Sequence, residues 1–319
     1  MHIYRKVKKS LGKYEKIFEY HNKNGRKIGD ENIIEYVRSL KIPPNYIDVE
    51  IDLNKNAKIL ATGYDQAGRK QYIYNQKFVE KRMDERFCKM IPFSKKIHTI
   101  ENDVDKLLNT RGYSKEKNIA LIIRIIMHCN FRIGNEIGKE KYNSYGISTL
   151  LKKHINIKGN KTVIDFIGKK GVRNHCTFID NKIKNSLDEL CSKKKNNDSV
   201  FDNVSATDVN NFLKQYGDFT TKDFRTWYAN VYFINEMKKL NKNEGIAESE
   251  AKRKKQVKMA VGIVAEKLHH TIAICKKKYI ISDLLTLYIE KPNKYNKLLD
   301  SNNSEKSFIN YVKYYCKGN

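Results

Sequence analysis

One tyrosine in this sequence stands where it could act on a phosphate group. Tyr279 directly follows three lysines, Lys276–Lys278, and the paired histidines His269 and His270 lie a short distance upstream. A tyrosine phenol has a reference pKa of about 10, so nearby cations favour its phenolate form. A phenolate is a nucleophile that can attack a phosphodiester and form a covalent tyrosine–phosphate ester. Such an ester conserves most of the free energy of the diester, so re-ligation would need no ATP.

Attack on a phosphodiester needs two further kinds of group. The non-bridging oxygens need positive charge, and arginine suits this role because its fork donates two hydrogen bonds and stays charged. The leaving 5′ oxygen needs a proton, and lysine suits this role because its pKa falls readily near other cations. The chain holds 63 Lys and Arg residues, so composition alone does not choose among them.

The charge of the chain points to a polyanionic partner. The 63 basic residues stand against 36 acidic ones, for a net charge of +27. Such an excess destabilises the compact state by self-repulsion, so we expect it to serve binding. Nucleic acid is the first candidate, because neutralising its phosphates releases counterions, and an anionic membrane is the second. We find no apolar run near the roughly 20 residues that a membrane span needs, and no signal peptide.

Cysteine and histidine spacing gives no sign of a metal. The six cysteines show no C-x-x-C spacing, and the eight histidines show no ligand spacing. We therefore expect no structural metal and no cofactor. Reduced thiols in a cytosolic compartment are the expected state of the cysteines.

A length of 319 residues favours two domains. The first 80 or so residues look β-rich, and residues 58–78 read as strand, turn and strand around Gly68. From about residue 80 a charged segment without Pro or Gly leads onward. We therefore predict an N-terminal β-rich domain over residues 1–82 and a second domain over residues 83–319.

The second domain carries mostly helical patterns. Ile119, Ile122, Ile126 and Cys129 recur at helical spacing on one face. Thr220 with Asp223 resembles a capping box at the start of a long helix. Residues 272–290 look like one further helix with Tyr279 inside it.

A small sheet interrupts the helices. Residues 154–178 read as a three-stranded meander, with turns at Gly159–Asn160 and Gly168–Gly171. The fold class is therefore α+β: a small N-terminal antiparallel β domain, then a larger, mostly α-helical domain with a small three-stranded sheet. Trp227 is expected in the core of the larger domain rather than as a stacking platform.

Seven short segments resemble those of one known family. They occur in one order with compatible spacing, although any one of them is a weak signal. The segments are "KIPPNYIDV" (41–49), "ATGYDQAGRKQYIY" (61–74), "FRIGNE" (131–136), "YGISTLLKKHI" (145–155), "DFIGKKG" (165–171), "KDFRTWYANV" (222–231) and "AEKLHHTIAICKKKY" (265–279). Together they resemble the small type IB DNA topoisomerases, the poxvirus and bacterial kind. The resemblance covers residues 41–290. It implies that residues 1–82 form a DNA-clamping domain and that residues 83–319 form a catalytic domain, with the fold that this family shares with the tyrosine recombinases.

The resemblance implies a role for each catalytic residue. Tyr279 matches the nucleophile that forms a 3′-phosphotyrosyl link. Arg132 and Arg225 match the two arginines that clamp the scissile phosphate. Lys169 matches the general acid on a hairpin turn. His270 matches a position that hydrogen-bonds a non-bridging oxygen, and this position is His in some members and Asn in others.

Other positions match residues that contact DNA. Gln71, Tyr72 and Tyr74 match residues that touch DNA in the major groove; by strand alternation Tyr72 and Tyr74 share one face and Gln71 faces the other way. Lys222 matches a second positive group near the leaving oxygen. The basic run at 252–255 is read as a solvated face.

The sequence departs from the family at two positions beside His270. The family usually has Gly where this chain has His269, and many members have Pro where it has Ile272. Because Gly is favoured at a helix C-terminus, His269 could alter how the preceding helix ends. The departure leaves open whether His269 shares the role of His270.

As a whole, the resemblance implies an enzyme that relaxes supercoiled double-stranded DNA. It would cleave one strand transiently, let the strand rotate and reseal it without ATP or metal, acting as a monomer that clamps DNA. Its expected location is the cytoplasm, or the virion or viral factory if the source is a virus. A tyrosine recombinase or integrase is the alternative, although recombinases usually carry His where this chain has Lys222. A non-catalytic basic DNA-binding protein is the second alternative.

Overall fold

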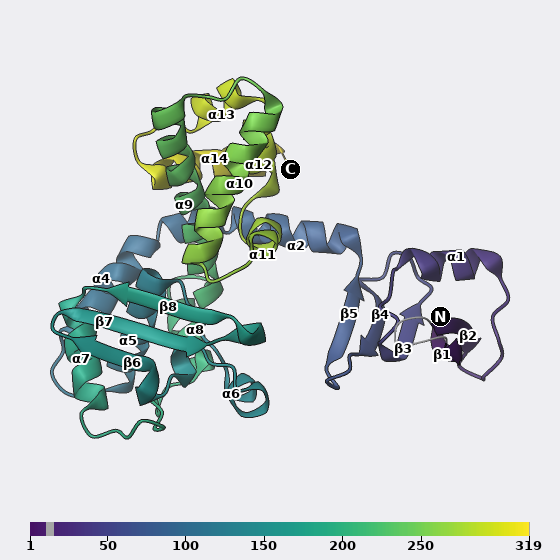
Figure 1. Ribbon diagram of the computed structural model, residues 1–319, viewed down its shortest axis with the longest axis horizontal. Coiled ribbons are helices and arrows are strands. Elements are labelled where there is room, and N and C mark those ends of the chain that lie inside the picture. The colour runs from purple at the N-terminus through teal and green to yellow at the C-terminus, as the bar shows by residue number, and fades with distance from the viewer. Residues whose placement is uncertain (11–15, 319) are drawn as a thin grey trace. The chain divides into compact units, whose positions relative to one another are not determined.

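The computed structural model (Figure 1) describes residues 1–10 and 16–318. Contacts between residues divide the chain into two compact units, Met1–Arg86 and Phe87–Asn319. The boundary predicted between residues 82 and 83 lies inside helix α2 (Gln76–Cys88), in which this division falls.

The N-terminal unit is built on one antiparallel sheet with the strand order β2-β1-β3-β4-β5. Its strands are β1 (His2–Ser10), β2 (Lys16–Asn22), β3 (Ile47–Asp52), β4 (Ile59–Tyr64) and β5 (Lys70–Tyr74). The β4–β5 hairpin confirms the strand, turn and strand expected over residues 58–78. Helix α1 (Glu31–Ser39) packs on this sheet, since its Val37 joins Ile3, Val49 and Ile51 in one buried cluster.

The C-terminal unit is mostly helical. Its helices beyond α2 are α3 (Met90–Ser94), α4 (Ile97–Leu108), α5 (Lys115–Cys129), α6 (Glu136–Tyr142), α7 (Asn181–Cys191), α8 (Ala206–Lys214), α9 (Thr221–Glu244), α10 (Glu250–Lys267), α11 (Ile272–Lys278), α12 (Ser282–Glu290), α13 (Pro292–Leu298) and α14 (Ser304–Gly318). In the described part of the chain, none of the helices is long and apolar enough to span a bilayer.

A three-stranded antiparallel sheet lies within this helical unit (Figure 1). It consists of β6 (Ile155–Lys158), β7 (Lys161–Ile167) and β8 (Arg173–Phe178), in that order. Short 3-10 turns cover Ile147–Thr149, Lys152–His154 and Lys169–Gly171. The meander and the α+β class predicted from the sequence are confirmed.

Helix α5 runs through the middle of the C-terminal unit. The four residues predicted to share one of its faces are buried, and so are Leu121, Ile123 and Ile125 on its other faces. A helix that is apolar on nearly all sides is a central helix rather than a surface one. Its buried position can therefore fix the segment that follows Cys129, the last residue of α5.

The C-terminal segment, for which the sequence suggested no role, packs onto the core. Phe308 of α14 lies against Trp227 of α9, with 5.3 Å between ring centroids. Trp227 is 1% exposed, so its predicted place in the core is confirmed. Cys316 of α14 forms a disulfide with Cys88 at the end of α2.

The expectation of reduced thiols is wrong for four of the six cysteines. Besides Cys88–Cys316, the structure pairs Cys129 at the end of α5 with Cys176 on β8. The partners are 228 and 47 residues apart in the sequence. Spacing along the chain cannot reveal such pairs, because only the fold brings their Cα atoms within the 4.4–6.8 Å that a disulfide usually spans. Cys191 and Cys275 are buried and free.

The single helix expected over residues 272–290 is also wrong. The structure has two helices, α11 and α12, and Tyr279 lies at the break between them with non-helical backbone angles. The break has a tertiary cause: a side chain from α9, Asn230, hydrogen-bonds the backbone on both sides of it.

Candidate active site

Arg225 is held in a buried position near the start of α9. The carboxylate of Asp223 accepts a 2.8 Å hydrogen bond from the backbone N–H of Thr220, which confirms the predicted cap. Arg225 follows within the first turns and is 3% exposed. Its guanidinium donates to the carbonyl oxygens of Asn130 and Leu268, the latter at 3.0 Å. A buried guanidinium with neutral acceptors keeps its full charge available for an anion.

Arg132 is positioned by irregular backbone just after α5. The helix ends at Asn130, which takes a left-handed conformation with φ 53°. The Arg132 carbonyl oxygen then accepts a 3.0 Å hydrogen bond from the N–H of Ile147. Here the backbones of Gly134 and Gly146 approach so closely that a Cβ on either would lie under 3.0 Å from the other residue. The glycines of the "RIGNE" and "YGIST" segments therefore allow the contact that holds Arg132.

His270 lies between the two arginines. An Nη2 of Arg132 lies 2.9 Å from His270 Nδ1, and an Nη2 of Arg225 lies 2.7 Å from His270 Nε2. Burial lowers the pKa of His270, and the charges of Arg132 and Arg225 lower it further, to about 3. The imidazole is therefore neutral at physiological pH.

Tyr279 completes the cluster. Its ring is 8% exposed and lies 4.8 Å from the His270 ring, centroid to centroid. The Arg225 guanidinium carbon is 5.2 Å from the centroid of the Tyr279 ring.

The charges around Tyr279 favour its phenolate. Burial by itself raises the pKa of a phenol, but Arg225 opposes it through its charge and hydrogen bonding. The charges of Arg132 and Lys222 act in the same direction, and the pKa of Tyr279 lies below its usual value. The arrangement therefore suits a phenol oxygen that acts as a nucleophile.

Asn230 is a site residue that the sequence analysis missed. It is fully buried on α9, and its amide nitrogen donates to the Tyr279 carbonyl oxygen at 2.9 Å. Its amide oxygen accepts from the N–H of Ile281 at 3.0 Å. Asn230 thus fixes the backbone that carries the tyrosine. Its place within the matched "KDFRTWYANV" segment, one turn beyond Arg225, was the available signal.

Lys222 and Lys169 differ in their relation to the cluster of Arg132, Arg225, His270 and Tyr279. Lys222 is exposed on the first turn of α9, and its charge reaches Tyr279. Lys169 is exposed on the turn between β7 and β8, and the structure describes no side-chain hydrogen bond between it and the four clustered residues. Backbone hydrogen bonds connect this turn to the cluster indirectly. The N–H of Tyr145 donates to the Ile167 carbonyl at 2.9 Å, and two residues later the N–H of Ile147 donates to the Arg132 carbonyl.

The predicted DNA contacts of the N-terminal unit lie on β5. Tyr72 and Tyr74 are each 43% exposed and stack with 5.8 Å between centroids, so they share one face as expected. Gln71 is half-buried and donates to Asp65 Oδ2 at 2.9 Å. Its amide is therefore engaged within the β4–β5 hairpin.

The two basic runs differ in their surroundings. In the run at 252–255, Arg253 is tied to its own unit, since its guanidinium donates to the carbonyl oxygens of Ala247 at 2.9 Å and Glu248. The three lysines at 276–278 on α11 are exposed just before Tyr279. The second run is the one that lies beside the cluster.

Comparison with known proteins agrees with this geometry. A family model described as the catalytic core of eukaryotic DNA topoisomerase I matches residues 75–305, and one for the N-terminal domain of bacterial DNA topoisomerase IB matches residues 17–65. DNA topoisomerase 1B of Acanthamoeba polyphaga mimivirus is 31% identical over 296 residues, which is 87% of this chain and 86% of the relative.

Relatives with lower sequence identity carry the same kind of name. DNA topoisomerase 1B of Vaccinia virus (strain Copenhagen) is 27% identical over 277 residues, covering 83% of this chain and 85% of its own length. DNA topoisomerase 1 of Schizosaccharomyces pombe is 29% identical over 167 residues, 49% of this chain and 20% of its own length.

The two-unit fold and the family matches together define the class of this protein as a DNA topoisomerase. Within that class, the chain belongs to the type IB DNA topoisomerases, which are isomerases. The resemblance stated from the sequence is confirmed, and the family makes DNA the partner of this chain.

Proposed function

We propose that this chain relaxes supercoiled duplex DNA with Tyr279 as the nucleophile. The observation that carries the proposal is the geometry of the cluster, in which the Tyr279 ring lies 4.8 Å from the His270 ring and 5.2 Å from the Arg225 guanidinium carbon. The charges of Arg225, Arg132 and Lys222 support it, because they lower the pKa of the phenol. The phenol oxygen attacks the scissile phosphorus, forms the 3′-phosphotyrosyl bond and releases the 5′ oxygen of the next nucleotide. After the free strand rotates, the 5′ hydroxyl attacks the same phosphorus and releases the tyrosine.

The arginines and His270 receive the non-bridging oxygens. In the free protein both guanidinium groups lie within hydrogen-bond distance of His270 Nε2, Arg132 at 3.0 Å and Arg225 at 2.7 Å, and this nitrogen accepts from them. A phosphate entering the cluster takes over these donors, because an anion accepts a stronger hydrogen bond from guanidinium than a neutral ring does. Neutral His270 still has one N–H, which it donates to a phosphate oxygen. The donors are in place before the reaction, so little reorganisation is needed as charge develops.

Lys169 supplies the proton to the leaving 5′ oxygen, and Lys222 adds positive charge nearby. Support for Lys169 comes from its exposed position on a hairpin turn, where it is free to meet DNA. The exposed tyrosines Tyr72 and Tyr74 of the N-terminal unit contact the major groove, with Gln71 reaching bases once it leaves Asp65.

The mode of action follows the family. The protein acts as a monomer that clamps duplex DNA, and it needs neither ATP nor a cofactor. It works in the cytoplasm, or in the virion or viral factory if its source is a virus. The net charge of +27 supports tight binding that weakens as salt rises.

A relaxation assay tests the nucleophile. Supercoiled plasmid is incubated with protein in EDTA without nucleotide, and topoisomers are separated on a gel. We expect stepwise relaxation by the wild type and none by Tyr279→Phe, which lacks the attacking oxygen. Tyr314→Phe, at an exposed tyrosine of α14, is the matched control and should relax normally. Normal relaxation by Tyr279→Phe would refute the assignment, and strand exchange between two specific duplexes without relaxation would indicate a recombinase instead.

A further inference from the structure

His269 has a backbone conformation that its side chain disfavours. It follows the C-cap residue of α10 with φ 54°, in the left-handed region where glycine is usual. Two hydrogen bonds close the helix end: the N–H of His269 to the Glu266 carbonyl at 3.0 Å, and the N–H of His270 to the Ala265 carbonyl at 2.8 Å. This is the Schellman pattern, which orients His270 just beyond the helix. The helix therefore ends as it would with glycine, although a histidine occupies the position.

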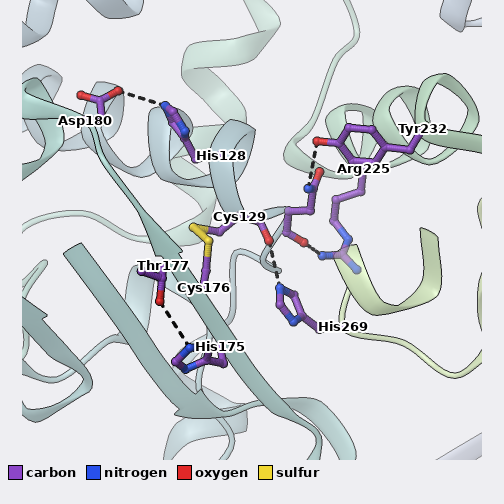
Figure 2. The surroundings of a disulfide bond; sticks show 10 residues. His128, Cys129, His175, Cys176, Thr177, Asp180, Arg225, Tyr232 and His269 are labelled. Carbon is purple, nitrogen blue, oxygen red and sulfur yellow. Dashed lines mark hydrogen bonds and ion pairs between the residues drawn. A yellow bond between two sulfur atoms is a disulfide. The ribbon is translucent and has the colours of Figure 1, made fainter. Parts of the chain in front are cut away.

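The His269 side chain makes contacts that a glycine could not make. Its Nε2 lies 3.0 Å from the carbonyl oxygen of Cys129. Figure 2 marks this contact with a dashed line. Its ring packs on Phe131, with 4.8 Å between centroids. Burial lowers the pKa of His269 to about 4. The hydrogen bond to Cys129 opposes this shift, and nearby positive charges add to it. The ring is therefore neutral, and because a carbonyl only accepts, the single ring proton lies on Nε2.

These contacts join the ends of two helices, α5 and α10, and each end is followed by a site residue. Cys129 is the last residue of α5, and Arg132 follows it closely. The next carbonyl, that of Asn130, accepts from Arg225, and so does that of Leu268, the residue before His269. The end of α5 and the end of α10 are thus tied to each other by one histidine and one arginine.

We propose that His269 is a positioning residue, which holds the end of α5 against the end of α10 so that Arg132 and His270 meet the phosphate together. The proposal rests on the roles proposed above for Arg132 and His270. His269 does not itself bind the phosphate, because its one N–H is used by the Cys129 carbonyl. Histidine is less favourable than glycine at this left-handed backbone position, but its side chain adds the contacts with Cys129 and Phe131.

The Cys129–Cys176 disulfide is a second tether on the same segment. It joins the end of α5 to β8, on the side opposite His269 in Figure 2. A test of His269 must therefore be run with and without a thiol reductant. If both tethers act on Arg132, removing His269 has the larger effect in the reduced protein.

The test compares His269→Gly, His269→Gln and wild type. Single-turnover cleavage of a short duplex is measured at saturating protein, with DNA affinity and thermal unfolding measured alongside. Glycine suits φ 54° but cannot reach Cys129, so we expect His269→Gly to stay folded and bind DNA normally while it cleaves about tenfold more slowly. Glutamine can donate to the same carbonyl and should restore part of the rate. Asn143→Gly is the matched control, since it relieves an uncharged left-handed residue (φ 49°) at the end of α6 and should cleave as wild type.

A second comparison separates this inference from the proposed function. In an Arg132→Ala protein, His269→Gly should slow cleavage by less than twofold further, because its effect passes through Arg132. Slow cleavage by Arg132→Ala together with wild-type cleavage by His269→Gly would overturn the inference alone. An equal slowing by His269→Gly in both backgrounds would also overturn it. Wild-type cleavage by Arg132→Ala would refute the role of Arg132, and the inference with it.

Discussion

At the scale of single residues, the site depends on how its charges are balanced. Two guanidinium groups lie beside one imidazole and one phenol, and they act on these neighbours in opposite senses. They lower the pKa of the phenol by stabilising its anion, and they help burial to keep the imidazole neutral. The same two cations therefore favour the phenolate of Tyr279 and help to prevent His270 from becoming a third cation.

The neutral state of His270 has a testable consequence. Since its pKa is about 3, its protonation should not affect the reaction between pH 5 and pH 8. We expect the pH profile of kcat/KM, which reports on the free enzyme, to show no inflection near pH 6.5 from this group. His270→Ala should slow cleavage by about 100-fold, the usual loss for one donor to a developing charge, and His270→Asn by less. A wild-type inflection near pH 6.5 that disappears in His270→Asn would show that the imidazolium is the active form.

At the scale of elements, helix ends do the positioning. Arg132 follows the end of α5, His270 follows the end of α10, and Tyr279 ends α11. Only Arg225 lies within a helix. Backbone groups at helix ends lack partners inside the helix, so other parts of the fold must satisfy them. Those added bonds, from Asn230 and His269, hold the ends in fixed places.

The role of Asn230 can be tested by removing its hydrogen bonds. Asn230→Ala leaves the Tyr279 carbonyl and the Ile281 N–H without this buried partner. We expect the free energy of unfolding to fall by about 1–3 kcal/mol, the usual cost of unsatisfied buried groups, and cleavage to slow because the tyrosine is no longer fixed.

Asn230→Asp is the matched control, measured by urea unfolding and single-turnover cleavage. It keeps the acceptor for the Ile281 N–H but loses the donor to Tyr279. If Asn230→Asp cleaves as wild type, the bond to the Tyr279 carbonyl does not position the nucleophile.

At the scale of the whole molecule, helix α14 packs against the core of the C-terminal unit and is linked to the start of that unit by a disulfide. The core helix α9 carries Trp227 against Phe308 of α14, and the Cys88–Cys316 disulfide joins α14 to the start of the unit. A link across 228 residues restricts the unfolded chain strongly. Helix α14 therefore stabilises the unit without contributing a residue to the site described above.

Loss of this link should affect stability rather than chemistry. We expect Cys316→Ser to lower the free energy of unfolding by about 2–4 kcal/mol under oxidising conditions, with plasmid relaxation at 25 °C unchanged. In the presence of a thiol reductant, wild type and Cys316→Ser should unfold at nearly the same denaturant concentration. A mutant that unfolds like the wild type under oxidising conditions would mean that the disulfide contributes nothing to stability.

The sequence by itself determined the local parts of this protein. Strand alternation and turn glycines predicted the β4–β5 hairpin and the β6–β8 meander, and the Thr220–Asp223 pair predicted the start of α9, because each depends on neighbouring residues only. Ordered motifs identified the family and the candidate residues. Tertiary structure alone decided the break at Tyr279, the cysteine pairs and the tether from His269, since each requires residues from distant segments. Residues 272–290 look helical by local preference, but the helix is interrupted at Tyr279, whose carbonyl accepts a hydrogen bond from the amide of Asn230, 49 residues earlier in the chain.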